Sequence, residues 1–364
     1  MHITDLELTN FRKFSKFKLE NLKLINAIIG KNGVGKTSII ESIYFGSLAK
    51  SFKSYYDEVL LKEKESFFKI KINIEKDNIN KKLEIILNGK DKKAKIDNQL
   101  IKKLSDYICE YSVILFSPDD IRLIKDNPNT RRNYLNIALS NVNKKYIKLI
   151  NSYNKIIKNK NDYLKKINLN MNLDNKYLDV LDEKIAEIGI DICKCRKEYI
   201  ESINKYINNI FKKFKKEENI KITYVSDFLD KNKDEIINLL KKVRNKEIIL
   251  GITTTGIHRD DFKFINNNKN AENYSSQGTQ KLILLSLKLS EIKILDNEYK
   301  IKPILLLDDL FSELDESNQK KVMRLISRKY QTFITTTDLN NIKVKDLKDI
   351  NVIKIREVKK NERK

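Results

Sequence analysis

Residues 30–37 have the types and spacing needed to hold a phosphate. They read GKNGVGKT, which is the pattern Gly-x-x-x-x-Gly-Lys-Thr. Its glycines let backbone N–H groups converge on a phosphate at a helix N-terminus, its lysine reaches the β- and γ-phosphates, and its threonine hydroxyl ligates Mg²⁺. The pattern therefore predicts a site for a nucleoside triphosphate with Mg²⁺. We expect its contacts to come from Gly30, Lys31, Asn32, Gly33, Val34, Gly35, Lys36 and Thr37.

Two adjacent carboxylates far along the chain could complete this site. Asp308 and Asp309 follow an apolar run, and two carboxylates at the end of a buried strand are costly without a cation. We expect Asp308 to hold Mg²⁺ through water and Asp309 to orient or deprotonate the attacking water. Lys36 and Asp309 are then the catalytic residues. The alternative for Asp309 is a helix-capping or loop acid.

A further pattern bears on the nucleotide base. Residues 159–162 read NKND and match the guanine-reading pattern Asn-Lys-x-Asp. They fall inside an amphipathic helical stretch rather than after a strand, in a chain crowded with Asn and Lys, so we attribute the match to chance. The nucleotide that remains is ATP.

The elements that must position these residues are visible as changes in hydrophobic period. Residues 1–25 and 67–75 alternate apolar and polar side chains as strands do, whereas the residues after Thr37 take helical spacing. The phosphate loop thus lies between a strand and a helix, as its chemistry requires. Residues 302–310 and 332–338 have the apolar character of buried parallel strands.

A helical period dominates about residues 131–215. Two apolar seams, separated by the turn-rich residues 168–175, predict two antiparallel helices that form a short arm. We therefore expect an α/β phosphate-binding domain made of residues 1–125 and 249–364, split in sequence by an inserted helical arm at residues 126–248. The first seam comprises Tyr146, Ile150, Tyr153, Ile157, Leu164 and Ile167, interrupted by Lys160, and the second comprises Leu178, Leu181, Ile185, Ile188, Ile192, Cys195 and Tyr199.

The chain is strongly basic. Lys+Arg 73 against Asp+Glu 50 gives a formal net charge of +23, which attracts polyanions such as nucleic acid. The chain is also rich in Lys, Asn and Ile, which AT-rich genomes favour, so charge alone does not identify the partner. Residues 141–170 hold eight lysines against one acid, Asp162, and this fits either a solvated helix face or a phosphate-contacting face.

Cysteine usage and hydropathy indicate the compartment. Cys109, Cys193 and Cys195 lack the spacing of a zinc site and suit a reducing environment, and Cys195 is interpreted as a seam residue. No apolar run approaches the roughly 20 residues that span a bilayer. We expect a soluble cytoplasmic protein without a membrane partner.

Residues 274–291, YSSQGTQKLILLSLKLSE, hold a second anion-binding pattern, because Ser-x-Gly opens a long amphipathic helix. Here the sequence resembles the signature motif of ABC-type ATPases, with Ser276 and Gly278 at the positions of its serine and second glycine. Residues 312–315, SELD, resemble the D-loop of that superfamily. The resemblance implies an ABC-type ATPase head, a P-loop NTPase, that forms a two-fold homodimer in which Ser276 and Gly278 contact in trans the ATP of the other subunit.

Departures from the ABC pattern indicate a particular branch. Gln277 and Thr279 replace the first glycine and the final glutamine of the signature. Asp309 stands where most members have Glu, and Thr337 takes the position of the usual switch histidine. With these departures, the chain is similar over essentially its whole length to the RecF family of recombination and repair ATPases, which is related to the SMC and Rad50 heads. The segments that carry the similarity are LTNFRKF (8–14), FSPDDIRLIKDNPNTRR (116–132), YLDVLDEKIAEIG (177–189) and GIHRDDFKF (256–264).

The resemblance also suggests roles for four basic residues. It implies that Arg12 contacts the nucleotide, as the equivalent Arg does in Rad50-type heads; the alternative is a surface Arg at a strand end. His258 either senses DNA or nucleotide near a dimer interface or satisfies a strand-end hydrogen bond. Arg131 and Arg132 match an RR pair of the family, which either grips phosphates or holds the base of the insertion together.

A RecF-like function implies an ATP-dependent DNA-binding protein of recombinational repair and replication restart. ATP would close the dimer on single-stranded or gapped DNA, and the bound protein would help RecR, with RecO, to load recombinase. This links the chain to DNA damage and the SOS response. Asp309 and the missing switch histidine imply a weak, DNA-stimulated ATPase that works as a switch.

Two other classes share the order of these motifs. A transport ATPase would energise a membrane permease, but that class keeps the switch histidine and has no basic helical insertion. A chromosome-organising protein of the SMC or Rad50 type inserts hundreds of residues of coiled coil that end in a hinge or zinc hook, whereas this arm is short and has no CxxC apex.

Overall fold

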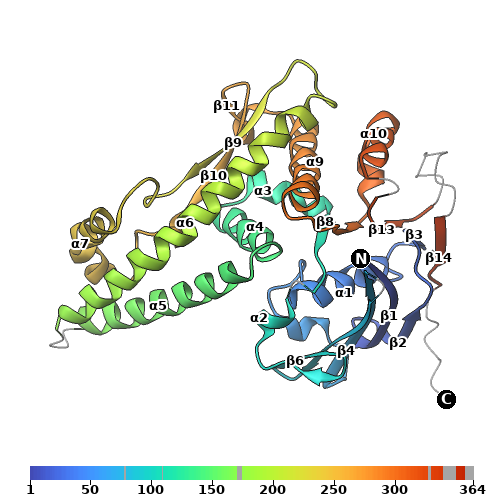
Figure 1. Ribbon diagram of the computed structural model, residues 1–364, viewed down its shortest axis with the longest axis horizontal. Helices are drawn as coiled ribbons and strands as arrows, with labels where there is room; N and C mark the ends of the chain where they lie inside the picture. The colour runs from blue at the N-terminus through green and yellow to red at the C-terminus, as the bar shows by residue number, and fades with distance from the viewer. Residues whose placement is uncertain (78, 109, 170–173, 327–328, 339–349, 357–364) are drawn as a thin grey trace. The chain divides into compact units, whose positions relative to one another are not determined.

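The computed structural model describes residues 1–77, 79–108, 110–169, 174–326, 329–338 and 350–356; Cys109 lies outside these ranges. The chain divides into two compact units (Figure 1). The head unit comprises Met1–Asp120 and Lys288–Lys364, and the arm unit comprises Ile121–Leu287. The head unit is therefore split in sequence around one insertion.

The boundaries of the units differ from the predicted domain limits of 126–248 for the insertion. Residues 249–287 cluster with the arm unit. The reason is that strand β10 (Asp261–Asn266) pairs with β9 (Ile220–Val225) and packs on helix α4 (Pro128–Ser140). The signature segment around Ser276 thus belongs to the arm unit.

An antiparallel sheet of six strands occupies part of the head unit, in the order β2-β1-β4-β5-β6-β7. The predicted alternation at residues 67–75 forms β4, in which Phe68, Ile70, Ile72 and Ile74 are at most 1% exposed. One face of this sheet therefore belongs to the core. The strands are β1 (His2–Phe11), β2 (Phe14–Leu19), β4 (Phe67–Lys76), β5 (Ile79–Asn88), β6 (Asp91–Ile96) and β7 (Gln99–Leu100).

A parallel sheet of five strands carries the chemical motifs of the head unit, in the order β14-β3-β13-β12-β8. All residues of β12 are buried, as expected for an apolar strand with neighbours on both sides. Because β13 lies between β3 and β12, the carboxyl ends of these three strands meet at one edge. The strands are β3 (Ile25–Ile29), β8 (Val113–Phe116), β12 (Ile304–Leu307), β13 (Thr332–Thr336) and β14 (Ile350–Lys354).

Helix α1 (Lys36–Leu48) is buried along almost its whole length, because it contacts strands of both head sheets. Such burial fixes the position of the residues at its first turn. Helix α9 (Gln277–Lys293) begins in the arm unit and ends in the head unit. The other helical elements of the head are η1 (Asp57–Leu60), α2 (Leu104–Tyr107), η4 (Ile294–Glu298), η5 (Leu310–Glu313) and α10 (Glu316–Ile326).

The two helices predicted for the arm are α5 (Lys144–Asn168) and α6 (Lys176–Phe211), which lie side by side (Figure 1). Their contact differs from the predicted apolar seam. Ile188 and Cys195 are only half-buried, whereas Asp182 and Arg196 are buried. Charged side chains therefore occupy part of the interior of the arm.

Helix α7 (Lys233–Leu250) packs against both α5 and α6. It begins with a reciprocal capping box, in which the Asn232 side chain accepts from the Glu235 N–H and the Glu235 side chain accepts from the Asn232 N–H. The arm also contains a small sheet, β11-β10-β9, that the helical prediction for residues 126–248 did not include. The remaining arm elements are η2 (Pro118–Ile121), which begins in the head, α3 (Arg122–Lys125), η3 (Ile257–Arg259), β11 (Lys269–Asn270) and α8 (Ala271–Tyr274).

Hydropathy gives one further result. Within the described ranges, the chain has no helix with the length and apolar character needed to span a membrane.

Candidate nucleotide-binding site

The phosphate loop joins β3 to α1 in the head unit. Gly35, the N-cap of α1, has a φ of 105°, which side chains rarely adopt, and an added Cβ would lie 2.5 Å from Lys13 Cε. An added Cβ at Gly30 would lie 2.7 Å from the carbonyl oxygen of Ile355 and from Val34 Cγ2. Both positions therefore need glycine, and the loop leads directly into the N-terminus of a 13-residue helix, where N–H groups are free to bind an anion.

The Lys36 side chain reaches back to the first residues of the phosphate loop. Its Nζ donates to the carbonyl oxygens of Gly30 at 2.6 Å and Lys31 at 3.0 Å, and the residue is 8% exposed. Burial lowers the pKa of the Lys36 ammonium, while the nearby carboxylates of Asp309 and Asp308 act in the opposite direction. The ammonium is thus held at the loop, bonded to neutral carbonyls that the stronger acceptors of a phosphate could replace.

Asp308 and Thr37 come together as the sequence predicts. Thr37 Oγ1 donates to Asp308 Oδ1 at 2.9 Å, and Thr335 Oγ1 donates to the same oxygen at 2.8 Å. Asp308 is 5% exposed, and burial raises the pKa of its carboxyl, whereas the hydrogen bonds from Thr335 and Thr37 and the charge of Lys53 lower it. Residues from α1, β13 and the end of β12 therefore converge on one carboxylate.

These oxygens fit Mg²⁺. A carboxylate and a hydroxyl are hard oxygen donors, and nucleotide-bound Mg²⁺ usually takes only one or two protein ligands beside phosphates and water. Among the described residues, no group of three or more His, Cys, Asp or Glu side chains could hold a metal by itself. Asp308 and Thr37 thus suit a metal that arrives with a nucleotide rather than a permanent protein-only metal site.

Asp309 adopts the left-handed conformation, with a φ of 52°, and is exposed. Its backbone N–H donates to Thr335 Oγ1 at 2.9 Å, and its carbonyl accepts from Ser312 Oγ at 2.7 Å. The Asp309 carboxylate makes no capping hydrogen bond to the helical turn that follows. The backbone is therefore fixed while the carboxylate stays exposed, which argues against the helix-capping alternative; the role of Asp309 toward the attacking water stays a prediction.

Arg12 is held by an acidic partner. Its Nε and one terminal nitrogen each donate to a different oxygen of Glu41 at 2.8 Å, and its other terminal nitrogen donates to the carbonyl of Val59 at 3.0 Å. Glu41 lies on α1 and is 1% exposed, and Ser51 Oγ also donates to it. The structure thus fixes Arg12 to the helix of the phosphate loop; its contact with a nucleotide stays a prediction.

Two lysines near the phosphate loop were not predicted from the sequence to belong to the site. Lys13 Nζ donates to the carbonyl of Gly33 at 2.5 Å, and the exposed Lys53 is near enough to Asp308 to lower the pKa of that carboxyl. Lys13 stands beside Arg12 in the NFRKF segment, which could have indicated it. Lys53 had no distinguishing signal among so many lysines.

Ser276 and Gly278 lie at the start of α9 in the arm unit. Ser276 Oγ accepts from the Thr279 N–H at 3.2 Å, so it caps the helix. An added Cβ on Gly278 would meet no heavy atom within 4 Å, and the glycine is exposed. The buried Gln280 fixes this turn by donating to the carbonyls of Ala271, Glu272 and Ser275. The signature is thus an ordered, open helix N-terminus; its contact with the ATP of a second subunit stays a prediction.

The two remaining positions singled out in the sequence are Thr337 and His258. Thr337 is exposed just after β13. His258, in the arm unit, has both ring nitrogens engaged: Nε2 lies 3.2 Å from the carbonyl of Thr253 and Nδ1 lies 3.1 Å from the Tyr153 hydroxyl. The carbonyl must accept from Nε2–H, so Nδ1 accepts from the tyrosine. Burial lowers the pKa of His258 to about 4, and the ring is therefore neutral at pH 7.

Comparison with known folds supports this architecture. The structure matches a solved structure described as "Structure of the recombination mediator protein RecF-ATP in RecFOR pathway" at a TM-score of 0.89, with 32% identity over 98% of this chain and 95% of that one. It matches the ATPrS counterpart at the same TM-score, with 31% identity over 98% of this chain and 96% of that one. It also matches an Smc head at a TM-score of 0.53, with 15% identity over 94% of this chain and 91% of that one, which shows the fold alone. The fold is that of an ABC-type ATPase head related to RecF and SMC proteins.

Sequence comparison gives the family. A model described as "RecF/RecN/SMC N terminal domain" matches residues 2–362. Proteins named DNA replication and repair protein RecF are 36% identical in Bacillus cereus (strain G9842) over 363 residues and 35% identical in Lactobacillus gasseri over 364 residues. Each match covers 98% of this chain and 97% of the relative. The chain therefore belongs to the RecF family.

Proposed function

We propose that this chain is an ATP-dependent DNA-binding protein of recombinational repair and replication restart. ATP binding closes a homodimer, the closed dimer binds single-stranded or gapped DNA, and slow, DNA-stimulated hydrolysis reopens it. The bound protein acts in the cytoplasm with RecR and RecO to load recombinase, and so promotes the SOS response to DNA damage. The names of the relatives, which include DNA replication, repair and the RecFOR pathway, support this proposal.

The convergence of Thr37 and Thr335 on the buried Asp308 is the observation that carries the proposal. It joins the phosphate loop to the acidic end of β12, as a P-loop ATPase requires. The chemistry then divides among residues of the head unit. Loop N–H groups and Lys36 bind the phosphates, Thr37 and Asp308 hold Mg²⁺, and the exposed Asp309 orients or deprotonates the attacking water. Bound Mg²⁺ supplies neutralisation of the phosphate charge.

The open signature supports a site shared between two copies of the chain. Gly278 has free space around it, and Ser276 keeps the turn ordered. A helix N-terminus with open space at Gly278 suits the approach of a triphosphate held by a second copy. Of the two alternative classes, the transport ATPase has no support in the matched family, and the 36-residue α6 is far shorter than an SMC coiled coil.

Sedimentation velocity tests the proposal. The wild type and a slow-hydrolysing Asp309→Asn variant should dimerise with Mg²⁺–ATP and bind a labelled gapped duplex, whereas Lys36→Met should do neither. Ser276→Arg should bind ATP as a monomer, because the arginine fills the space that the second copy needs. Ser152→Arg, which adds the same charge at an exposed position of α5, is the matched control and should dimerise normally.

Two results would overturn the proposal. If Ser276→Arg dimerises with ATP as well as the control does, the site is not shared. If the wild type has no affinity for the gapped duplex with ATP, the DNA-binding function is wrong.

A further inference from the structure

Arg131, the first member of the RR pair, is fully engaged inside the arm unit. Its Nε and one terminal nitrogen donate to the two carboxylate oxygens of Asp261 at 2.6 and 3.1 Å. Its other terminal nitrogen donates to the carbonyls of Leu123 and Asp126. With the residue only 7% exposed, Arg131 holds α4 to the start of β10 and has no role left in binding a ligand.

Arg132 and Arg259 have different surroundings. Arg132 is half-buried and donates to the carbonyl of Asp260 at 2.8 Å, and the exposed Arg259 donates to the carbonyl of Thr253 at 3.1 Å. Within the described part of the chain, neither guanidinium forms an ion pair with a carboxylate; the neighbouring Asp261 and Asp260 are paired with Arg131 and Arg196 instead. Burial lowers the pKa of Arg132 and the charges of Arg196 and Arg259 lower it further, whereas the carboxylates of Asp261 and Asp260 raise it. Both guanidiniums are therefore held by backbone carbonyls rather than by direct ion pairs.

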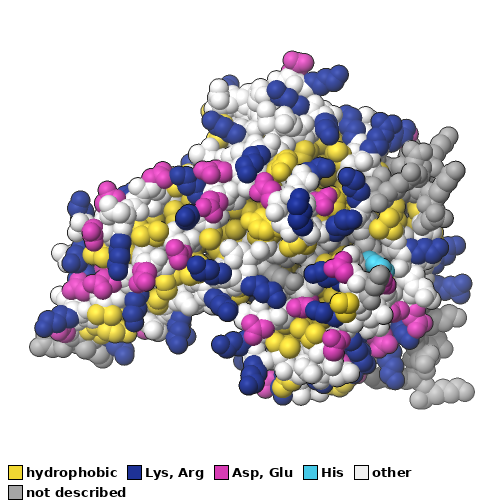
Figure 2. Space-filling view, viewed as in Figure 1, with side chains coloured by type: hydrophobic (Ala, Val, Ile, Leu, Met, Phe, Trp, Pro, Cys, Tyr) yellow, Lys and Arg dark blue, Asp and Glu magenta, His cyan; other side chains and the backbone are white. Residues whose placement is uncertain are grey.

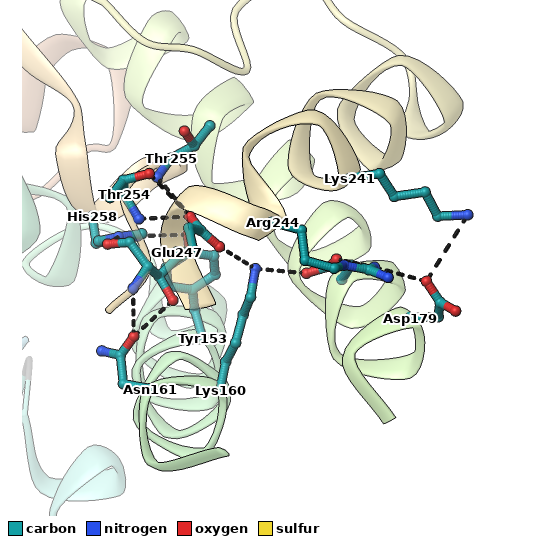
Figure 3. A network of polar contacts seen from close by, with 12 residues as sticks. Tyr153, Lys160, Asn161, Asp179, Lys241, Arg244, Glu247, Thr254, Thr255 and His258 are labelled. Carbon is teal, nitrogen blue, oxygen red and sulfur yellow. Dashed lines mark hydrogen bonds and ion pairs between the residues drawn. The ribbon is translucent and has the colours of Figure 1, made fainter. Parts of the chain in front are cut away.

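Both arginines are bonded to one segment, residues 253–260. Figure 3 shows Glu247 and Lys160, which hold this segment through Thr254 and Thr255. Glu247 accepts from the N–H groups of Thr254 at 2.6 Å and Thr255 at 3.3 Å. Lys160 Nζ in turn lies 2.8 Å from Glu247 Oε2, with both side chains 0% exposed. Buried charges on α5 and α7 thus determine the conformation of this segment.

The other end of the segment is fixed as well. Asp260 is 2% exposed and accepts from Arg196 at 2.6 Å and from the Tyr224 hydroxyl at 2.5 Å. Arg196 also donates to the carbonyl of Ile257 at 2.7 Å. Because the carbonyls that hold Arg132 and Arg259 are immobilised, the two guanidiniums lose little further conformational freedom when they bind an anion.

Net charge alone does not locate a DNA contact. On the face shown in Figure 2, Lys and Arg side chains are scattered among acidic and polar ones. We propose that Arg132 and Arg259 form a specific phosphate-binding site of the arm unit, which takes the sugar-phosphate backbone of DNA. The planar guanidinium binds phosphate bidentately, and this site offers two of them that make no direct ion pair with a carboxylate. The inference rests on the proposed DNA-binding function and assigns residues to it.

The salt dependence of DNA binding tests this site. The Arg132→Gln/Arg259→Gln variant and the wild type are titrated onto a labelled gapped duplex at several salt concentrations, with Mg²⁺ and a slowly hydrolysed ATP analogue. Loss of two phosphate contacts should reduce the slope of log K against log[salt] by about 1.8, at about 0.9 for each contact. The advantage of the wild type should therefore shrink about tenfold between 50 and 200 mM salt.

The control is Arg122→Gln/Lys197→Gln, which removes the same charge from an exposed and a half-buried arm residue that are already paired with Asp126 and Asp230. It should retain the slope of the wild type. Circular dichroism and ATP-dependent dimerisation check that each variant is folded and nucleotide-competent. If the double variant does not fold, Arg259→Gln alone, at an exposed position, should reduce the slope by about 0.9.

The outcomes separate this inference from the function on which it rests. If the wild type binds DNA and the double variant has the same slope as the control, Arg132 and Arg259 do not contact phosphates. A weaker affinity with an unchanged slope also contradicts the site, because it indicates a structural effect. If the wild type does not bind the duplex at all, the proposed function itself fails.

Discussion

Replacing Lys160 with methionine should destabilise the arm unit substantially. Lys160 Nζ lies 2.7 Å from Asp182 Oδ1 and 2.8 Å from Glu247 Oε2, and all three side chains are 0% exposed. Removing one partner of a buried ion pair generally costs about 3–5 kcal/mol, because the remaining charge is uncompensated. Asp182 would keep Arg244 at 2.7 Å, and Glu247 would keep its donors from Thr254 and Thr255. We therefore expect a loss near the lower limit, about 3 kcal/mol.

Urea unfolding followed by circular dichroism measures this loss, with Lys158→Met, an exposed position on the same helix, as the matched control. The control should stay within about 0.5 kcal/mol of the wild type. Hydrogen exchange adds a local readout, since 3 kcal/mol corresponds to an exchange rate over a hundredfold faster at the Thr254 and Thr255 amides. Adding Glu247→Gln to Lys160→Met should recover part of the loss, because it removes the uncompensated charge. A Lys160→Met protein as stable as the control would refute the reasoning.

Other substitutions test the head site and the arm separately. Thr335→Val removes one hydroxyl donor from Asp308, so the Mg²⁺-dependent part of ATP affinity, measured by calorimetry with and without Mg²⁺, should fall about 10- to 100-fold. Gly35→Ala should abolish ATP binding, because Gly35 combines a φ of 105° with a Cβ clash. The control is Gly89→Ala, at a φ of 56° with no neighbour within 4 Å of the added Cβ; it should lose only some stability and bind ATP normally. Because the pKa of His258 falls from 6.5 to about 4 on folding, its protonation opposes folding, and the associated stability is complete above pH 6.5 and lost as the pH falls toward 4. Urea unfolding across this range should show the wild type losing up to about 3 kcal/mol that His258→Gln does not lose; equal losses would contradict the assignment.

The head site could be predicted because each of its motifs is a short, continuous stretch of the sequence. The loop at residues 30–37 and the pair Asp308–Asp309 each follow an apolar strand, and parallel strands bring such ends to one edge of a sheet. The partners of individual side chains were not predictable. Nothing in the sequence around Arg12 points to Glu41 as its acceptor, or to Thr335 as a donor to Asp308. Those contacts depend on the packing of α1 and on the order of the strands, which a pattern of residue types does not determine.

In the arm unit, too, the partners of individual side chains could not be predicted from the sequence. Helical periodicity correctly placed α5 and α6, but it treated Lys160 as an interruption of an apolar seam and left Asp182 without a role. Residues 159–162, whose NKND match we attribute to chance, lie inside α5, and the structure shows what two of them do. Lys160 joins the buried carboxylates, and Asn161 accepts from the N–H and hydroxyl of Thr253. A buried cation is recognisable only when its distant partners are known.

The cations around the phosphate loop are held by groups of the chain itself. Lys36 and Lys13 donate to carbonyls of the loop itself, and Arg12 is bonded to Glu41 on the helix that follows. A triphosphate offers charged acceptors that are stronger than carbonyls, so we expect the lysines to exchange partners on binding with little rearrangement of the chain. Under the proposed function, the exposed Asp309 carboxylate is the last group that the head unit contributes to the site. Ser276 and Gly278 belong to the arm unit, and a Cβ at Gly278 would meet no atom within 4 Å. In the proposed dimer, these two residues of a second copy would therefore enclose the nucleotide.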